Sequence, residues 1–166
     1  MKKIGILSDT HSCRDARYAK YFSECDEIWH AGDIGDIGLL EELKSLGKPV
    51  RAVSGNIDSG EVRRQCKEIE IFTVEGIKVL LTHIGGYPHK YAAGIKTLLR
   101  QNHINLMVCG HSHILRVMYD SELDLLHINP GAAGKQGWQN KRTLVRLVID
   151  EDSPNKINNL EIIELG

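Results

Sequence analysis

Two histidines separated by one residue are the first candidates for chemistry in this sequence. They lie in Gly110-His111-Ser112-His113, directly after the apolar run 106–109, which is typical of a buried strand. Residues two apart on a strand share a face, so the two rings converge if the strand or the loop after it holds them that way. A neutral imidazole is a good ligand for zinc, manganese, iron or nickel. The motif is therefore a candidate metal site; the alternative is a surface turn that contains two histidines.

A similar pattern follows two strands near the N-terminus. Strands expected at 3–7 and 27–30 end just before Asp9-Thr10-His11 and Gly32-Asp33. A carboxylate combined with an imidazole suits a first-row divalent metal. The alternative for the first motif is a helix N-terminus, in which a Ser or Asp side chain caps the next helix. The two interpretations are compatible, because another residue can cap the helix while Asp9 binds metal.

Two further polar residues follow strands. Asn56 comes after a strand expected at 49–53, and His83 comes after one expected at 77–81. Asn56 offers a neutral oxygen ligand, although Asn-Ile-Asp is equally a plain turn. His83 alone would be interpreted as a turn histidine beside two glycines. Its position after a strand, like that of the other donors, makes it a candidate ligand.

The elements that must position these residues follow from the hydrophobic pattern. Strands alternate with helices expected at 14–23, 39–46 and 91–102, which predicts a largely parallel sheet with its functional edge at the carboxyl ends of the strands. The segment 60–67 is expected as a loop or short helix over the site. Further strands complete two packed sheets with helices outside; they are expected as a hairpin at 69–74 and 77–81, a hairpin at 115–119 and 125–128, and closing strands at 143–149 and 160–165.

Length and composition restrict the class of protein. A chain of 166 residues with 42% hydrophobic content suits one globular domain spanning 1–166. The net charge of -1, with interspersed charges, provides no basic surface for nucleic acid or membrane. The apolar run 4–7 is too short for a secretory or transmembrane segment, so we expect a cytoplasmic protein. The four cysteines form no Cys-x-x-Cys pair, and we expect reduced thiols rather than a thiolate zinc site.

The strand-end donors together exceed what one tetrahedral metal site requires. They are Asp9, His11, Asp33, Asn56, His83, His111 and His113. Seven nitrogen and oxygen donors suit two metal ions that share a bridging carboxylate. Such a pair generates hydroxide near neutral pH and neutralises an anionic transition state. The sequence therefore predicts phosphoester hydrolysis.

These motifs, in this order, resemble the calcineurin-like metallophosphoesterase superfamily, and within it the small bacterial and archaeal phosphodiesterases. The resemblance implies an α/β fold, a four-layer αββα sandwich of two mixed β-sheets flanked by helices. It implies that one metal is held by Asp9, His11 and His113, the other by Asn56, His83 and His111, and both by the bridging Asp33. It also implies catalytic roles for Asp33 and Asn56: a hydroxide bridging the metals attacks phosphorus in line, and Asn56 orients a phosphate oxygen.

One departure from the family pattern affects the expected chemistry. Many relatives place a histidine after the Gly-Asn pair, where it protonates the leaving group, but this chain has Ile57. An aliphatic side chain transfers no proton, so we expect slow cleavage of esters with poor leaving groups. His89, in the segment 85–91, is an alternative acid.

The leading hypothesis is a metal-dependent phosphodiesterase acting on small phosphodiesters. The expected cofactors are two divalent ions, manganese first, with nickel, zinc, iron or cobalt as alternatives. One alternative is a non-enzymatic scaffold comparable to the retromer subunit VPS29; the complete set of seven donors favours the enzyme, because unused buried donors are costly. A nuclease is a further alternative, disfavoured by the missing basic stripe. The sequence leaves open whether the protein forms a homo-oligomer through its edge strands.

Overall fold

The computed structural model of the chain describes residues 1–166 and contains two five-stranded sheets. The first sheet has the order β12-β11-β1-β2-β3, with β1 (Lys2–Leu7), β2 (Glu27–His30), β3 (Val50–Ala52), β11 (Thr143–Ile149) and β12 (Ile157–Glu164). The second has the order β4-β5-β8-β10-β9, with β4 (Ile69–Val74), β5 (Ile77–Thr82), β8 (Leu106–Val108), β9 (Arg116–Asp120) and β10 (Leu125–Asn129).

Both sheets are mixed, and each contains three adjacent parallel strands. In the first sheet β1, β2 and β3 run parallel, and β11 and β12 are antiparallel to their neighbours. In the second sheet β5, β8 and β10 run parallel, and β4 and β9 pair with them antiparallel. Parallel neighbours require crossover connections, which place helices on the sheet faces. The carboxyl ends of the central strands therefore point in a common direction within each sheet.

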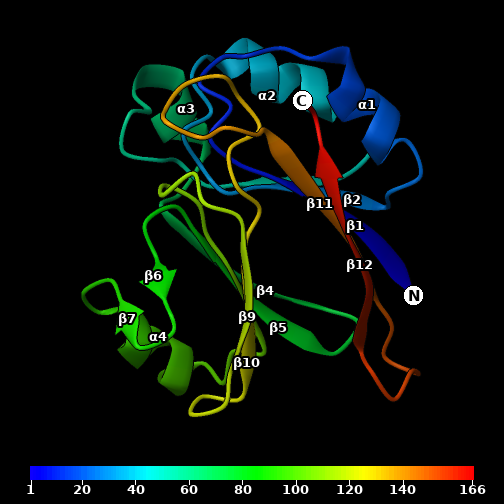
Figure 1. Cartoon of the computed structure of the whole chain (residues 1–166), viewed down its shortest axis with the longest axis vertical. Coiled ribbons are helices and arrows are strands. Elements are labelled where there is room, and N and C mark those ends of the chain that lie inside the picture. Colours follow the sequence, from blue (N-terminus) through cyan, green and yellow to red (C-terminus); the bar gives the residue numbers. More distant parts are fainter.

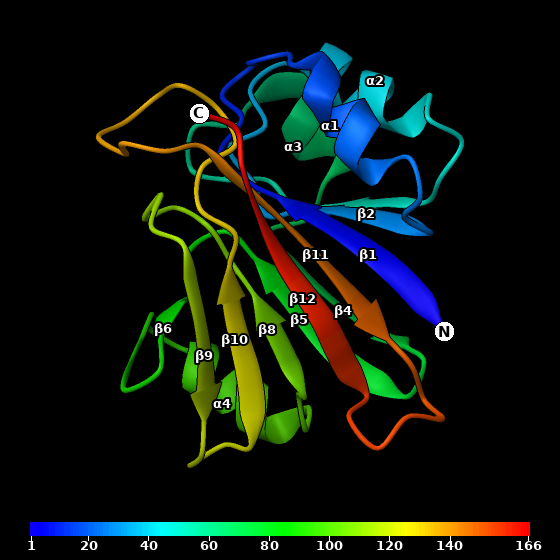
Figure 2. The ribbon, with the colours of Figure 1, turned by 45° about the vertical axis from the view of Figure 1, so that its right-hand side comes forward.

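Four helices complete the layers. Three of them, α1 (Ala16–Phe22), α2 (Ile37–Lys44) and α3 (Gly60–Gln65), lie on one side of the molecule, and α4 (Ile95–Gln101) lies on the opposite side (Figures 1 and 2). A small hairpin of β6 (Gly86–Tyr87) and β7 (Lys90–Tyr91) lies beside α4. None of the helices combines the length and apolar character needed to cross a membrane.

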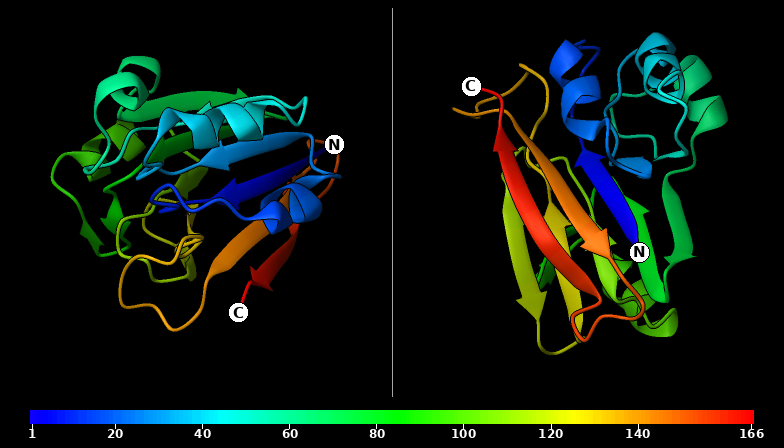
Figure 3. Two further views of the ribbon diagram at one scale, coloured as in Figure 1. Left: turned by 90° about the horizontal axis from the view of Figure 1, so that it is seen from above. Right: turned by 90° about the vertical axis from the view of Figure 1, so that its right-hand side faces the viewer.

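Alternation along the strands creates the buried layers. Ile4 and Ile6 of β1 join the core between the sheets, whereas Leu7 faces the cluster under α1, α2 and α3. In the second sheet Leu81 faces the inter-sheet core and Leu80 faces the cluster under α4. Figure 3 shows this sandwich from two further directions. The predicted four-layer αββα sandwich is confirmed; the extent of the domain stays a prediction.

Most differences from the predicted elements lie at their ends. The segment 60–67 contains α3, and the segment 85–91 forms the β6–β7 hairpin. The helix expected over 91–102 begins only at Ile95, because Gly94 has a left-handed backbone with φ 82° that interrupts helical geometry.

Candidate metal centre

The seven predicted donors all lie in loops at the carboxyl ends of parallel strands. The loops after β1, β2 and β3 carry Asp9, His11, Asp33 and Asn56, and those after β5 and β8 carry His83, His111 and His113. Backbone bonds join the loops within each sheet: His11 N donates to the Asp33 carbonyl, and Gly110 N donates to the His83 carbonyl. Other bonds join loops of the two sheets, among them the one from His111 N to Asp9 Oδ2 at 3.1 Å. The donors are thus brought to one place by both sheets.

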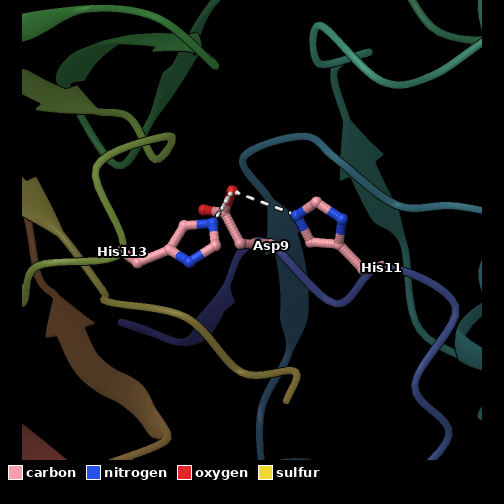
Figure 4. Close-up of side chains that lie close together, drawn as sticks. All are labelled: Asp9, His11 and His113. Carbon is pink, nitrogen blue, oxygen red and sulfur yellow. Dashed lines mark ion pairs between the residues drawn. The ribbon is translucent and has the colours of Figure 1, made fainter. Parts of the chain in front are cut away.

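The first cluster consists of Asp9, His11 and His113. Ligand atoms of these three side chains lie within 4.8 Å of one another. The Nε2 atoms of His113 and His11 lie 3.2 and 3.9 Å from Asp9 Oδ1 (Figure 4). All three side chains therefore present atoms to one small space.

The second cluster consists of Asp33, His83 and His111, whose ligand atoms also lie within 4.8 Å of one another. Asp33 Oδ2 lies 3.2 Å from His83 Nε2 and 3.4 Å from His11 Nε2, a member of the first cluster. Asn56 Oδ1 accepts a hydrogen bond of 3.0 Å from His111 Nδ1, so Asn56 adjoins the second cluster. One carboxylate oxygen of Asp33 therefore faces both clusters.

The backbone at these positions is unusual. Five of the donor residues have positive φ values between 46° and 74°, namely Asp9, His11, Asp33, His111 and His113. A left-handed backbone is uncommon outside glycine and costs free energy, so it persists only where the surroundings enforce it. Gly110 permits its loop to lie close against the loop after β1, because a Cβ at this position would lie 2.1 Å from Ser8 Oγ and 2.7 Å from Asp9 Oδ2. The loops are held in a conformation that aims the donors inward.

The donor set fits divalent metal ions. Three of its buried atoms have no hydrogen-bond partner: Asp9 Oδ1, His11 Nε2 and His83 Nε2. Unsatisfied buried polar atoms are rare because each is costly, and metal ions in the two clusters would satisfy all three. Imidazole nitrogens with carboxylate oxygens suit first-row divalent metals. The two His/Asp clusters are therefore candidates for a dimetal site, without indicating which metal.

Partners outside the clusters select which atom of each donor faces inward. His83 Nδ1 donates to the Ala31 carbonyl at 2.7 Å, and His113 Nδ1 donates to Gln139 Oε1 at 3.0 Å; the tautomer then leaves Nε2 free for a metal. Asp9 Oδ2 accepts from Ser8 Oγ at 2.7 Å, so the other oxygen of Asp9 stays unpaired. This arrangement leaves one inward atom on each of these side chains.

Two supporting residues were not identified as such in the sequence. Gln139 lies in the loop between β10 and β11, and Asn129 Nδ2 donates to the Gly110 carbonyl at 3.0 Å and to Ser112 Oγ at 3.1 Å. Asn129 directly follows the strand expected at 125–128, and no sequence signal marked Gln139. His89 is exposed between β6 and β7.

Mutual interactions shift the pKa values of the donors. Burial raises the pKa of Asp9 and of Asp33, but the neighbouring histidines, together with a hydrogen bond from Ser8 to Asp9 and one from the Ile57 backbone to Asp33, outweigh burial and lower both values. Burial lowers the pKa of His83, but Asp33 and Asp9 outweigh it and raise the value. The Asp9 carboxylate, 3.2 Å from His113 Nε2, raises the pKa of His113 against the opposing effect of burial. Without metal, the centre favours charged carboxylates beside protonated histidines.

These shifts predict how stability depends on pH in metal-free protein. The raised His83 and His113 pKa values stabilise the fold below about pH 6.5, and this contribution is lost as pH rises through the folded values. The lowered Asp pKa values stabilise it above about pH 3.9, and this is lost as pH falls. Burial lowers the pKa of His30 to about 4 and also lowers that of His127, so their contribution to stability is lost as pH falls below about 6.5. Calorimetry in EDTA should therefore show the highest Tm near pH 6.5, with a decline on either side.

Near neutral pH, metal affinity should rise with pH, whereas the stability of the metal-free protein falls. A metal displaces the imidazole protons, so affinity should rise from pH 6 to pH 8. Titration of manganese at pH 6 and pH 8 measures this change in affinity. A double variant, His83→Gln and His113→Gln, tests the stability prediction: without metal, its Tm should decline less above pH 6.5 than that of the wild type. A decline of the same size in that variant would contradict the assignment to these histidines.

Comparison with known proteins identifies the class to which this fold and centre belong. Residues 1–152 match the calcineurin-like phosphoesterase superfamily domain. The chain belongs to that superfamily. It is 33% identical over 135 residues to "Probable metallophosphoesterase MJ0623" of Methanocaldococcus jannaschii, covering 78% of this chain and 67% of the relative.

Two other relatives extend the comparison. The phosphodiesterase MJ0936 of the same organism is 27% identical over 144 residues, covering 78% of this chain and 82% of the relative. The structure of Vps29 from Entamoeba histolytica in complex with zinc superposes with a TM-score of 0.72 at 15% identity, covering 99% of each chain. At that identity the likeness concerns the fold alone.

Proposed function

We propose that this protein is a two-metal phosphodiesterase that hydrolyses small phosphodiesters. The observation that carries the proposal is the position of Asp33 Oδ2, 3.4 Å from His11 Nε2 and 3.2 Å from His83 Nε2. An oxygen between the two clusters suits a carboxylate shared by two ions. The names of the relatives, a probable metallophosphoesterase and a phosphodiesterase, support the same activity.

Each donor has a role in this proposal. One ion is held by Asp9, His11 and His113, the other by Asn56, His83 and His111, and Asp33 contacts both. Bound divalent ions, with manganese proposed, would supply hydroxide near neutral pH and neutralise charge developing on the phosphoryl oxygens. Asn56 is exposed and its Oδ1 contacts His111 Nδ1; in this proposal its amide nitrogen donates to a phosphate oxygen.

The proposal is tested by returning metals to stripped protein. Bis-p-nitrophenyl phosphate and its monoester are supplied with manganese, nickel, zinc, iron, cobalt or magnesium in turn, and bound metal is counted by mass spectrometry. We expect metal-restored turnover that favours the diester. Failure of every metal to restore turnover, together with an absence of bound metal, would overturn the proposal and favour a scaffold. Single-stranded DNA serves as a further substrate, and preferential cleavage of it would indicate a nuclease.

The absence of a proton donor at Ile57 predicts a strong dependence on the leaving group. Ile57 is 46% exposed, and its backbone N donates to Asp33 Oδ1 at 3.0 Å; a new side chain there can thus reach the centre without opening a cavity. In Ile57→His we expect the rate for diphenyl phosphate, relative to bis-p-nitrophenyl phosphate, to rise about 100-fold, because general-acid catalysis matters most for the poorer leaving group. Steady-state kinetics on both esters measure this ratio. In Ile57→Asn, which is polar but donates no comparable proton, the ratio should stay as in the wild type; an equal rise there would contradict the explanation.

A further inference from the structure

Large apolar side chains are exposed beside the donors. Ile57 follows Asn56, Ile84 follows His83 and Ile114 follows His113, and these three isoleucines are 46, 46 and 57% exposed. Single exposed apolar residues are ordinary on a protein surface. Here they occur in three separate loops, each directly next to a donor. We name these isoleucines, together with Trp138, the apolar rim.

Trp138 is fully exposed, although the backbone on both sides of it is anchored to the centre. On one side, a Cβ at Gly137 would lie 2.3 Å from His113 Nδ1, so only glycine fits against that ring. On the other, Gln139 accepts a hydrogen bond from His113 and donates to the Gly134 and Gln136 carbonyls. The β10–β11 loop projects from the same end of the molecule as the loop after β1 (Figures 1 and 2). Trp138 is thus anchored beside the first cluster through its two neighbours, while its indole is exposed and no side chain packs on it.

A cavity lies on another side of the centre. It has a volume of about 280 Å³, and Asn56 and His83 form part of its wall. Four apolar residues also line this cavity: Ile69, Ile84, Ala93 and Ile95. The ion pair between Arg63 and Glu68, at 2.8 Å, also belongs to its lining. The centre is therefore flanked by a cavity next to the second cluster and by an indole next to the first.

We propose that these two features bind the two organic groups of the substrate, which identifies its class as phosphodiesters that carry a planar aromatic or heterocyclic group. This inference rests on the proposed phosphodiesterase function. One ester group enters the cavity, and the planar group of the other stacks on Trp138, where burial of both apolar faces and offset stacking stabilise it. A monoester has only one organic group and fills one of the two subsites.

Inhibition of bis-p-nitrophenyl phosphate hydrolysis tests the stacking contact. Diphenyl phosphate and dimethyl phosphate carry the same charge and differ in their planar groups. In Trp138→Ala we expect the inhibition constant of diphenyl phosphate to rise about tenfold, the size of effect typical of lost aromatic stacking, and that of dimethyl phosphate to stay unchanged. Trp138→Phe should keep most of the preference. Tyr119→Ala, which removes another exposed aromatic side chain, is the matched control and should behave as the wild type.

Fluorescence provides a test that needs no turnover. The chain has two tryptophans, and Trp29 is fully buried, so acrylamide quenching reports on Trp138. Diphenyl phosphate should reduce quenching in protein loaded with the metal that supports turnover, or with manganese if none does; dimethyl phosphate should not. If the enzyme turns over substrate but diphenyl phosphate does not reduce quenching, or both diesters reduce quenching equally, the inference is overturned and the proposed function stays intact. Shielding without turnover would support the subsite and overturn the proposed function.

Discussion

Replacing Asp33 by Asn should reduce kcat/KM for bis-p-nitrophenyl phosphate at least about 1000-fold. Loss of a supporting residue around a metal ligand typically costs about 10–100-fold, and Asp33 faces both clusters through one oxygen, 3.2 Å from His83 Nε2 and 3.4 Å from His11 Nε2. The neutral amide removes a charge that holds two cations together. Steady-state kinetics with saturating manganese, combined with metal counting by mass spectrometry, should show lost activity and fewer than two bound ions.

The control separates this effect from a general loss of charge or fold. Asp152→Asn changes an exposed carboxylate in the turn between β11 and β12, and it should retain wild-type kinetics and metal content. Circular dichroism of Asp33→Asn should match that of the wild type. A folded Asp33→Asn protein that binds two ions and keeps more than about a tenth of the activity would contradict a bridging role.

Replacing Asp58 by Ala should destabilise the protein by about 3 kcal/mol. Its buried carboxylate accepts three backbone N–H bonds, from Ile34 at 3.1 Å, Gly35 at 2.9 Å and Gly55 at 2.7 Å. These bonds tie the loop that carries Asp33 to the loop that carries Asn56. The truncation leaves all three donors without their partner, so we also expect metal affinity to fall about 10–100-fold. Denaturant unfolding of metal-free protein and manganese titration measure the two effects.

Two further variants calibrate the prediction for Asp58. Asp58→Asn keeps one acceptor oxygen and should lie between the wild type and Asp58→Ala. Ser59→Ala alters the neighbouring N-cap of α3, whose side chain makes no capping bond, and should change the free energy of unfolding by less than about 0.5 kcal/mol. Equal denaturation midpoints for Asp58→Ala and the wild type would show that the three bonds contribute nothing net.

The sequence was sufficient for the strands of the two large sheets and the type of fold, and it predicted seven candidate donors. Apolar runs of four to seven residues, each followed by polar and glycine residues, show where strands end. Alternation with helices makes the central strands parallel, so their carboxyl ends gather. The order of the donor motifs then provided the family resemblance. Local pattern was informative here because each donor lies within five residues of a strand end, as Asp9 and His83 illustrate.

The tertiary structure decided what brings the two sheets together and what supports the donors. The contacts of His113 with Gln139 and of Gly110 with Asn129 join residues 26 and 19 positions apart, and the bond from His111 to Asp9 spans 102 positions. Such contacts follow from the packing of sheets and loops, which no local periodicity encodes. The same holds for Trp138, whose exposure beside the centre depends on how the β10–β11 loop is anchored to His113. Sequence alone determined which chemical groups follow the strands, because strand pattern is local; their convergence on one centre depends on packing between distant segments.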